Sequence, residues 1–300
     1  MKIHLIGLGK MGSNLALNLK DHGHEVIGYD PSEQVRKTIS ETGIVVKNSI
    51  DELLKNTNKD RTIVWLLVPN QYVDDVINQV KPYLKPNDII VDGGNSNFNL
   101  SLKRYESLLL EQIDFVDVGT SGGTFGARNG ACLMIGGTKE NFEYLEKVYK
   151  DISVPNGYGY MGSPASGHFT KMVHNGIEYG MMQAIGEGFD LLENSNFKNL
   201  DYKKIAQVWN NGSIIESALI GYIESAFDKD SHLDEIEGRI DDSGEGMWMI
   251  EEALKAKVSL PVITQSLFSR YKSKDEDKFG EKVVAAMRKE FGGHAVYKKK

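Results

Sequence analysis

The stretch "KIHLIGLGKMGSNLALNLKDHGHEVIGYD", residues 2–30, decides the fold of the first half of the chain. An apolar run at residues 3–6 leads directly into the pattern Gly-x-Gly-x-x-Gly at residues 7–12. The next segment has the apolar spacing of an amphipathic helix, and a second apolar run at residues 26–29 ends at Asp30. A strand, a glycine turn, a helix and a second strand closed by an acid together predict a dinucleotide-binding fold.

The glycine turn predicts a site for the pyrophosphate of NAD. Glycines permit the tight turn and the close approach of the phosphates, and the helix N-terminus supplies free N–H groups. Asp30 lies where a carboxylate can accept hydrogen bonds from the adenosine ribose, and its charge would repel a 2′-phosphate, so it favours NAD over NADP; Arg36 nearby could soften this preference. An ordinary glycine turn of an α/β protein is the alternative. We expect the cofactor to contact the turn and two later strand ends, at Gly7, Leu8, Gly9, Lys10, Met11, Gly12, Asp30, Val68, Pro69 and Asn95.

The rest of the N-terminal half continues the strand–helix alternation of a doubly wound sheet. Apolar runs predict strands in "TIVWLLVP", "DIIVDGG", "FVDVGTSGG" and "ACLMIGG", and "VDDVINQVKPYL" has helical periodicity. Ligands in such sheets bind at the carboxyl ends of strands, so we expect the substrate to contact Asn95, Ser121, Gly122 and Gly123, although each segment taken singly also fits an ordinary turn. Cys132 lies in a run typical of a buried strand, and we expect an inert core thiol there.

The C-terminal half has a different pattern. After "GSPASGH" at residues 162–168 the strand pattern largely stops. Helical periodicities follow in the segment that opens this half and in "YKKIAQVWNNG", "SALIGYIESAF", "WMIEEALKAKV" and "VITQSLFSRYKS". We therefore predict a Rossmann-type doubly wound α/β domain at residues 1–165 and an all-α domain at residues 166–300.

The composition limits the class of partner and the location. A formal net charge of −7 over 300 residues argues against a nucleic-acid or membrane-surface binder, so an anionic substrate needs a local positive pocket. The single cysteine excludes an internal disulfide and fits a reducing compartment. Gly7, Gly9 and Lys10 interrupt any signal peptide, and no apolar run approaches the ~18 residues of a membrane span. We expect a cytoplasmic protein without a metal site, because no spacing of His, Cys, Asp or Glu resembles one.

The stretch "FTKMVHNGIEYG", residues 169–180, gathers five different functional groups. On a helix all of them lie within about 80° of the lysine around the axis; they are Lys171, His174, Asn175, Glu178 and Tyr179. The opposite face carries a ridge of small residues that suits close helix packing, at Gly176, Gly180, Ala184 and Gly188. An amphipathic helix with a solvated face is one interpretation. A catalytic face is the other, because a solvated face usually repeats Lys and Glu.

The C-terminal stretch "MRKEFGGHAV", residues 287–296, is also unusual. It places Arg288 and His294 on either side of a Gly-Gly turn, so both could converge on one anion. A surface arginine and a loop histidine are the alternative.

Five segments together resemble the decarboxylating 6-phosphogluconate dehydrogenases: "GLGKMGSNLA", "DGGNS", "GTSGG", "GHFTKMVHNGIEYGMMQ" and "RKEFGGHAV". The length and Asp30 are similar to the short, NAD-preferring branch of that family. The 3-hydroxyacid dehydrogenases are looser relatives, which are not expected to match the Glu178-Tyr179 pair or the tail. The resemblance implies oxidative decarboxylation of 6-phospho-D-gluconate to D-ribulose 5-phosphate and carbon dioxide. It implies NAD as the cofactor, NADP as a weaker one, and a place in the pentose phosphate pathway or gluconate catabolism.

The resemblance also implies a role for each site residue. Lys171 matches the general base, which requires a neutral amine and hence a lowered pKa. Glu178 matches the acid that protonates carbon 1 of the enediol. Asn95 and Asn175 would hold substrate hydroxyls, and His174 would assist their orientation. The carboxylate end would be bound by Ser121, Gly122 and Gly123, and the phosphate end by Tyr179, Arg270, Arg288 and His294. In the family the tail arginine and histidine come from a neighbouring subunit, which implies a homo-oligomer, a dimer or a tetramer.

One segment departs from the family pattern. Where the long enzymes carry "KGTGKWT", this chain reads "DSGEGMWM", so the positions of the phosphate-binding lysine and threonine are Ser243 and Glu245. Met247 replaces the basic residue expected before the tryptophan, and phosphate binding would then depend more on Arg270 and Arg288. Two alternatives remain: a dehydrogenase of an unphosphorylated 3-hydroxy acid, and a non-catalytic NAD-binding sensor. The combination of Lys171, Asn175 and Glu178 argues against the sensor, which needs no acid–base pair.

Overall fold

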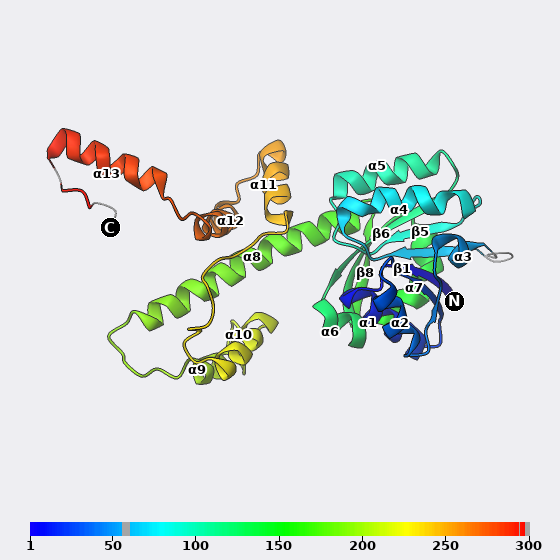
Figure 1. The fold of residues 1–300 in the computed structure, drawn as a ribbon, viewed down its shortest axis with the longest axis horizontal. Helices are drawn as coiled ribbons and strands as arrows, with labels where there is room; N and C mark the ends of the chain where they lie inside the picture. The colour runs from blue at the N-terminus through cyan, green and yellow to red at the C-terminus, as the bar shows by residue number, and fades with distance from the viewer. Residues whose placement is uncertain (56–60, 294, 298–300) are drawn as a thin grey trace. The chain divides into compact units, whose positions relative to one another are not determined.

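A computed structural model describes residues 1–55, 61–293 and 295–297. The chain separates into two compact units, Met1–Asn175 (unit 1) and Gly176–Lys300 (unit 2). Unit 1 contains a sheet covered by helices, and the described part of unit 2 is helical (Figure 1). The division falls within one long helix, whereas the boundary predicted from the sequence at residue 165 lies just before that helix begins at Ser166.

Unit 1 is built on one sheet whose described strands lie in the order β3-β2-β1-β4-β5-β6-β7-β8. Strands β1 to β6 are parallel to one another, β7 is antiparallel to β6, and β8 is parallel to β7. The strand order reverses between β1 and β4, which is where ligands of such sheets bind. The strands are β1 (Lys2–Ile6), β2 (Glu25–Tyr29), β3 (Val45–Val46), β4 (Ile63–Leu66), β5 (Ile89–Asp92), β6 (Asp114–Ser121), β7 (Ala131–Gly136) and β8 (Ser153–Gly162).

Helices cover both faces of this sheet (Figure 1). On one face lie α1 (Lys10–Asp21), α2 (Glu33–Ser40) and α7 (Lys139–Ile152), whose apolar side chains form one core with the strands. On the other face lie α3 (Ile50–Leu54), α4 (Val73–Val80) and α5 (Phe98–Leu109), which form a second core. Short helices follow β4, α4 and β6: η1 (Asn70–Tyr72), η2 (Lys81–Tyr83) and α6 (Gly123–Asn129). Because both faces are covered, β4 and the apolar part of β5 are continuous buried runs rather than alternating ones.

The carboxyl ends of β4, β5 and β6 meet at one edge of the sheet. Leu66 pairs with Asp92, and Asp92 pairs with Asp117, so the loops after β4 and β5 leave the sheet at the same level. Strand β6 continues past Asp117 to Ser121, where it pairs with β7. Ser121 therefore extends beyond the end of β5 toward the edge at which ligands are expected.

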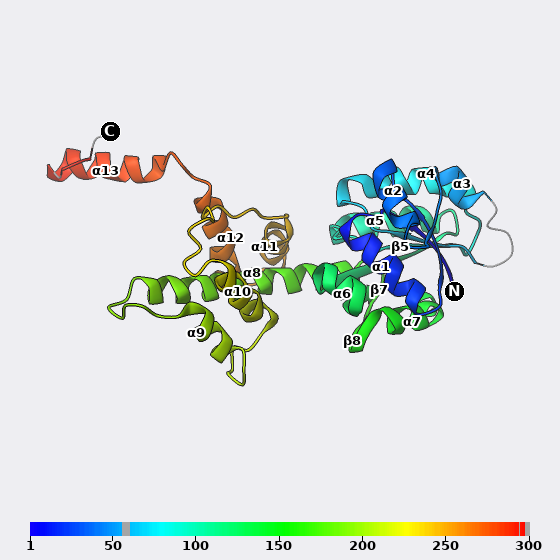
Figure 2. The same ribbon diagram turned by 60° about the horizontal axis from the view of Figure 1, so that its bottom comes forward.

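Unit 2 contains the continuation of α8 (Ser166–Glu193), which begins in unit 1. Its other described helices are α9 (Tyr202–Trp209), α10 (Ala218–Lys229), α11 (Glu245–Ala256), α12 (Pro261–Ser273) and α13 (Phe279–Gly292). Figures 1 and 2 both show α9 and α10 beside the last turns of α8. The contact is aromatic, because the ring centroid of Phe189 lies 6.2 Å from that of Tyr202 and 5.0 Å from that of Phe227.

The predicted architecture is confirmed, with an α/β unit followed by helices, and each quoted strand and helix is present. The ridge of small residues on α8 is confirmed in part. A Cβ on Gly176 would lie 2.2 Å from Sδ of Met249, and one on Gly180 would lie 3.3 Å from Cγ1 of Val262. Around Gly188 there is open space, so the described residues of this chain pack only the first part of the ridge.

The expectation that Cys132 is a core thiol is wrong, because this side chain is exposed. Its neighbours in β7, Ala131 and Leu133, are buried in the core on the α1 face. Side chains alternate between the two faces of a strand, so Cys132 points to the other face. Among the described residues, none of the helices is long and apolar enough to span a membrane.

Candidate active site

The glycine turn between β1 and α1 has the geometry of a phosphate cradle. Gly7 has φ of +94°, and a Cβ there would lie 2.4 Å from the carbonyl oxygen of Leu67. A Cβ on Gly12 would lie 1.8 Å from the carbonyl oxygen of Gly7, so both positions require glycine. Gly9 is the N-cap of α1 and has open space where a Cβ would stand. The turn thus leaves room at the helix N-terminus, where free N–H groups bind phosphate.

The other turn residues divide between the core and the surface. Leu8 is buried in the core, Met11 is half-buried, and Lys10 is exposed at the first position of α1. Lys10 is the member of this set whose charge could reach a bound phosphate. The predicted cofactor residues of the turn form one continuous backbone segment. Within it, the Leu8 side chain packs in the core and the Leu8 amide donates to Asp30.

Asp30 directly follows β2 and is tied to the glycine turn. Its Oδ2 accepts a hydrogen bond from the Leu8 amide at 2.8 Å, and its Oδ1 accepts one from the Ser32 amide at 2.9 Å. Arg36 donates from Nη1 to the carbonyl oxygens of Asp30 and Pro31, at 2.8 and 3.0 Å. The carboxylate is thus held in place beside the pyrophosphate turn, with a guanidinium nearby. A carboxylate oxygen accepts more than one hydrogen bond, so the group fits a ribose hydroxyl.

The loops after β4 and β5 lie beside the glycine turn. A Cβ on Gly7 would lie 3.1 Å from Cγ1 of Val68, and a Cβ on Gly94 would lie 2.9 Å from the carbonyl oxygen of Val68. Pro69 is the N-cap of η1. Asn95 follows Gly94 in the loop after β5. The structure therefore places the segment of Val68 next to the glycine turn and next to the loop that contains Asn95.

Three predicted substrate residues lie at the end of β6. Ser121 is the last residue of the strand, and Gly122 and Gly123 follow with φ of +116° and +60°. Such backbone angles favour glycine, so the turn depends on this sequence. The Ser121 Oγ lies 3.2 Å from Nε2 of His174, which joins the turn to α8.

The first half of the predicted α8 face is brought together around His174. Its Nδ1 lies 3.3 Å from Nζ of Lys171 and 3.1 Å from Oδ1 of Asn175. Lys171 and Asn175 are 8% and 9% exposed, so this is not a solvated helix face. The arrangement can exchange a proton between an amine and an imidazole, and it presents an amide and a hydroxyl to a polar ligand.

Close backbone packing holds Lys171 over β6. A Cβ on Gly119 would lie 2.4 Å from Cβ of Lys171 and 3.0 Å from the carbonyl oxygen of Gly167. A Cβ on Gly167 would in turn lie 2.5 Å from the carbonyl oxygen of Met134 and 2.6 Å from that of Asp117. The start of α8 therefore lies on the bare backbone of β6 and β7. Gly119 was not among the residues predicted from the sequence, where it is one glycine of a strand.

Asp117 anchors the start of α8 from within β6. It is fully buried, and its two carboxylate oxygens accept hydrogen bonds from the backbone N–H groups of Ala165 at 2.7 Å and His168 at 2.8 Å. Burial raises the pKa of Asp117, against the opposing effect of His168 and of these hydrogen bonds. Sequence reasoning missed this residue too. The available signal was a carboxylate between the apolar residues Val116 and Val118, and Asp92 similarly follows the apolar run of β5.

The second half of the predicted set lies in unit 2. The guanidinium of Arg270 lies 3.5 Å from the ring centroid of Tyr179 and donates to the carbonyl oxygen of Asp241 at 2.8 Å. The Tyr179 hydroxyl accepts a hydrogen bond from the Ser243 amide at 3.3 Å. Tyr179, Arg270 and the loop at residues 241–244 therefore form one cationic and polar group, which can bind an anion.

The remaining predicted residues are placed as follows. Glu178 is half-buried on α8, directly before Tyr179. In the segment that departs from the family pattern, Glu245 is buried at the start of α11 and Met247 is exposed. Arg288 is exposed on α13, and His294 lies outside the residues that the structure describes. Within the described ranges, no group of three or more His, Cys, Asp or Glu is placed to hold a metal ion.

Comparison with known proteins relates both halves of the chain to one enzyme family. Residues 2–162 match the NAD binding domain of 6-phosphogluconate dehydrogenase, and residues 167–299 match the 6-phosphogluconate dehydrogenase C-terminal domain. The chain is similar to a putative 6-phosphogluconate dehydrogenase of Bacillus subtilis, YqeC, with 48% identity over the full length of both chains. It is 38% identical to an NAD(+)-dependent, decarboxylating 6-phosphogluconate dehydrogenase of Haloferax volcanii, over 100% of this chain and 99% of that protein.

A solved structure shows the same relationship. The 6-phosphogluconate dehydrogenase of Plasmodium falciparum, whose structures include complexes with NADP+ and with 6-phosphogluconate, superposes with a TM-score of 0.81 at 29% identity. The match covers 100% of this chain and 66% of the longer Plasmodium chain. The glycine turn, the buried lysine on α8 and the matches along both halves support one conclusion: the chain belongs to the 6-phosphogluconate dehydrogenase family.

Proposed function

We propose that the protein catalyses the oxidative decarboxylation of 6-phospho-D-gluconate to D-ribulose 5-phosphate and carbon dioxide, with reduction of NAD. The observation that carries the proposal is the contact of the buried Lys171 with His174, which Ser121 joins from the end of β6. It supplies a base, and the neighbouring strand-end loops supply the polar groups that a hydroxy acid needs. The relative from Haloferax volcanii, which matches along the full length of this chain, is named an NAD(+)-dependent, decarboxylating 6-phosphogluconate dehydrogenase, and this name supports the same reaction.

We propose NAD as the preferred cofactor and NADP as a weaker one. The residues that would hold it are Gly7, Leu8, Gly9, Lys10, Met11, Gly12, Asp30, Val68, Pro69 and Asn95. Asp30 is oriented by the Leu8 and Ser32 amides, so its carboxylate is available to the ribose hydroxyls and repels a 2′-phosphate. Arg36, bound to the carbonyl groups beside it, is the cation that would keep some activity with NADP. When bound, the nicotinamide accepts the hydride from carbon 3 of the substrate.

In this proposal Lys171 and Glu178 carry the proton transfers. Neutral Lys171 removes the proton of the 3-hydroxyl as the hydride leaves, which yields a 3-keto acid. The carbon–carbon bond to the carboxylate then breaks, its electrons pass into the neighbouring carbonyl, and protonated Lys171 stabilises the enolate oxygen. Glu178 gives a proton to carbon 1 of the enediol to complete ribulose 5-phosphate. His174 and Asn175 orient Lys171 and the substrate hydroxyls.

The binding groups follow the length of the substrate. We assign the carboxylate end to Ser121, Gly122 and Gly123, and the hydroxyls to Asn95 and Asn175. The phosphate end is assigned to Tyr179, Arg270, Arg288 and His294. Arg270 has the firmest support, because it lies on Tyr179 beside the Ser243 loop that replaces the phosphate-binding segment of the long enzymes.

Assembly, domains and location are part of the same proposal. Arg288 is exposed on α13, which fits a tail that completes the site of a neighbouring subunit in a dimer or tetramer. We propose that residues 1–165 bind the cofactor and residues 166–300 bind substrate and form the oligomer. A dinucleotide and a phosphorylated sugar acid are both kept inside the cell, so we place the protein in the cytoplasm.

The test is NADH formation with 6-phosphogluconate and NAD or NADP, while carbon dioxide is trapped. The expected result is equal amounts of NADH and carbon dioxide, formed faster with NAD. Lys171→Met and Glu178→Gln should abolish turnover but not NAD binding. Glu187→Gln, on an exposed part of α8, should change neither turnover nor NAD binding. Absence of turnover with both cofactors, together with oxidation of an unphosphorylated 3-hydroxy acid, would refute the proposed substrate. Full turnover of Lys171→Met would refute the mechanism.

A further inference from the structure

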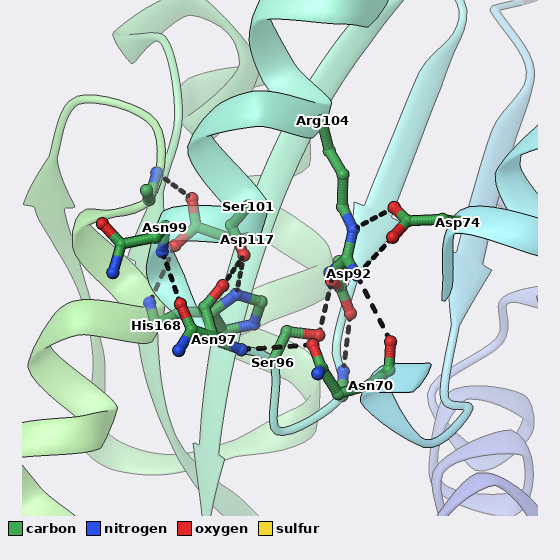
Figure 3. A network of polar contacts seen from close by, with 12 residues as sticks. Asn70, Asp74, Asp92, Ser96, Asn97, Asn99, Ser101, Arg104, Asp117 and His168 are labelled. Atoms are coloured by element: carbon green, nitrogen blue, oxygen red, sulfur yellow. Dashed lines mark hydrogen bonds and ion pairs between the residues drawn. The ribbon is translucent and has the colours of Figure 1, made fainter. Parts of the chain in front are cut away.

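Helix α5 carries two buried polar residues one helical turn apart, Ser101 and Arg104 (Figure 3). Serine and arginine side chains are rarely buried unless their polar atoms have hydrogen-bond partners. Here the partners lie mainly outside α5, in segments that carry residues of the proposed site. The two side chains thus connect α5 to two different parts of unit 1.

Arg104 binds the segments that follow β4 and β5. Its Nε and Nη2 donate to the carboxylate of Asp74 at 2.6 and 3.3 Å, and Nη2 also lies 3.3 Å from the carbonyl oxygen of Asn70. Its Nη1 donates to Oδ2 of Asp92 at 3.2 Å, where both side chains are almost fully buried. The guanidinium therefore fixes η1 against the end of β5.

Asp92, which Arg104 holds, in turn binds the loop that contains Asn95. Its Oδ1 accepts a hydrogen bond from the Gly94 amide at 3.1 Å, and its Oδ2 accepts one from the Ser96 hydroxyl at 2.8 Å. One carboxylate thus holds the residues on both sides of Asn95. Its orientation depends on Arg104, because a buried carboxylate is stable only with its charge compensated.

Ser101 binds the start of α8. Its Oγ shares a hydrogen bond with Nδ1 of His168 at 2.7 Å, and both residues are buried. The His168 amide also donates to Asp117, so the first turn of α8 is held from α5 and from β6 (Figure 3). Lys171 lies one helical turn after His168 on the same face.

We propose that Ser101 and Arg104 are positioning residues, which set the distance between Asn95 and Lys171 from one rigid helix. The inference rests on the proposed function, in which these two residues hold and deprotonate the substrate. Neither Ser101 nor Arg104 is among the residues to which the proposed function assigns the substrate or the cofactor. Directional hydrogen bonds suit this task, because an apolar contact would allow the two segments to slide. An error of about 1 Å in such a spacing lowers turnover by up to 100-fold.

The test compares matched variants on α5. Ser101→Ala removes the hydrogen bond to His168. Arg104→Met removes both the positive charge and the several N–H donors of the guanidinium, while Arg104→Lys keeps the charge alone. Ser107→Ala and Lys103→Met are the controls, because both residues are exposed on the same helix. We expect about tenfold lower kcat in Ser101→Ala and Arg104→Met, partial rescue in Arg104→Lys, and an unchanged KM for NAD in Ser101→Ala. The isotope effect from deuterium at carbon 3 should rise, because hydride transfer becomes slower than product release.

A second readout does not depend on the substrate. Amide hydrogen exchange should become faster at residues 93–97 in Arg104→Met and at residues 165–171 in Ser101→Ala, with no change in the controls. The proposal is overturned if these segments exchange as in the unsubstituted protein, or if kcat falls only in proportion to the folded fraction. Failure of the unsubstituted protein to oxidise 6-phosphogluconate would instead count against the proposed function, and the exchange experiment would still decide the inference.

Discussion

Replacing Gly119 by alanine should lower turnover, because the added methyl group displaces the side chain of Lys171. The added Cβ would lie 2.4 Å from Cβ of Lys171, whereas carbon atoms in contact prefer separations of about 3.5–4.0 Å. The carbonyl oxygen of Gly167 lies 3.0 Å from the same Cβ, so the backbone at the start of α8 leaves the added methyl group no room to shift. Lys171 must therefore move by roughly 1 Å or more. We expect kcat to fall by about 100-fold and the free energy of unfolding to fall by about 1–3 kcal/mol.

Gly157→Ala separates these two effects. A Cβ at Gly157 would lie 2.6 Å from Cγ2 of Val154 and 2.9 Å from the carbonyl oxygen of Ala131, so it overpacks the same sheet without a close contact to Lys171. We would measure kcat, the KM for NAD and the urea unfolding curve of both variants. Both should lose stability, and only Gly119→Ala should lose turnover. If the two variants keep similar kcat values, the close packing of Gly119 does not position Lys171 and the reasoning is refuted.

Three further predictions concern the cofactor, the phosphate and pH. Asp30→Asn should lower the ratio of kcat/KM for NAD to that for NADP by about tenfold, because the charge that repels a 2′-phosphate is lost; an unchanged ratio would exclude Asp30 from the discrimination. Arg270→Ala should raise the KM for 6-phosphogluconate by about 10–100-fold and leave the KM for NAD unchanged, since a charge-assisted contact contributes about 1.5–3 kcal/mol. Burial lowers the pKa of His4 and His24 below the ordinary value of 6.5, so as the pH falls the unfolded chain binds more protons than the folded protein does. The free energy of unfolding should therefore decrease below pH 6.5, by up to about 1.4 kcal/mol per pH unit for each histidine, and His24→Gln should show a shallower decrease in urea titrations.

Much of the fold could be predicted because its signals are local. The glycine turn, its flanking strands and Asp30 are contiguous in sequence, and their spacing is set by one βαβ unit. The helices of the C-terminal half follow from apolar periodicity in the same way. The contact of Lys171 with His174 was predictable because residues three apart share a helix face.

The environment of that face could not be predicted from local patterns. Whether it is solvated or buried depends on β6, where Gly119 and Asp117 receive the start of α8. Cys132 shows the same limit, because its run of neighbours predicts a buried strand while the side chain faces away from the core. Periodicity predicts that a strand has two faces, but not which of them is covered at a given residue.

The sequence by itself determined the order of strands and helices, the cofactor turn and the composition of the α8 face. The tertiary structure decided which buried groups hold that face in place: Asp117 at its first turn, and Ser101 and Arg104 from α5. These contacts join residues that are far apart in the chain. Their distances depend on how whole helices and strands pack, and packing follows from the complete set of side-chain volumes and hydrogen bonds rather than from any short stretch.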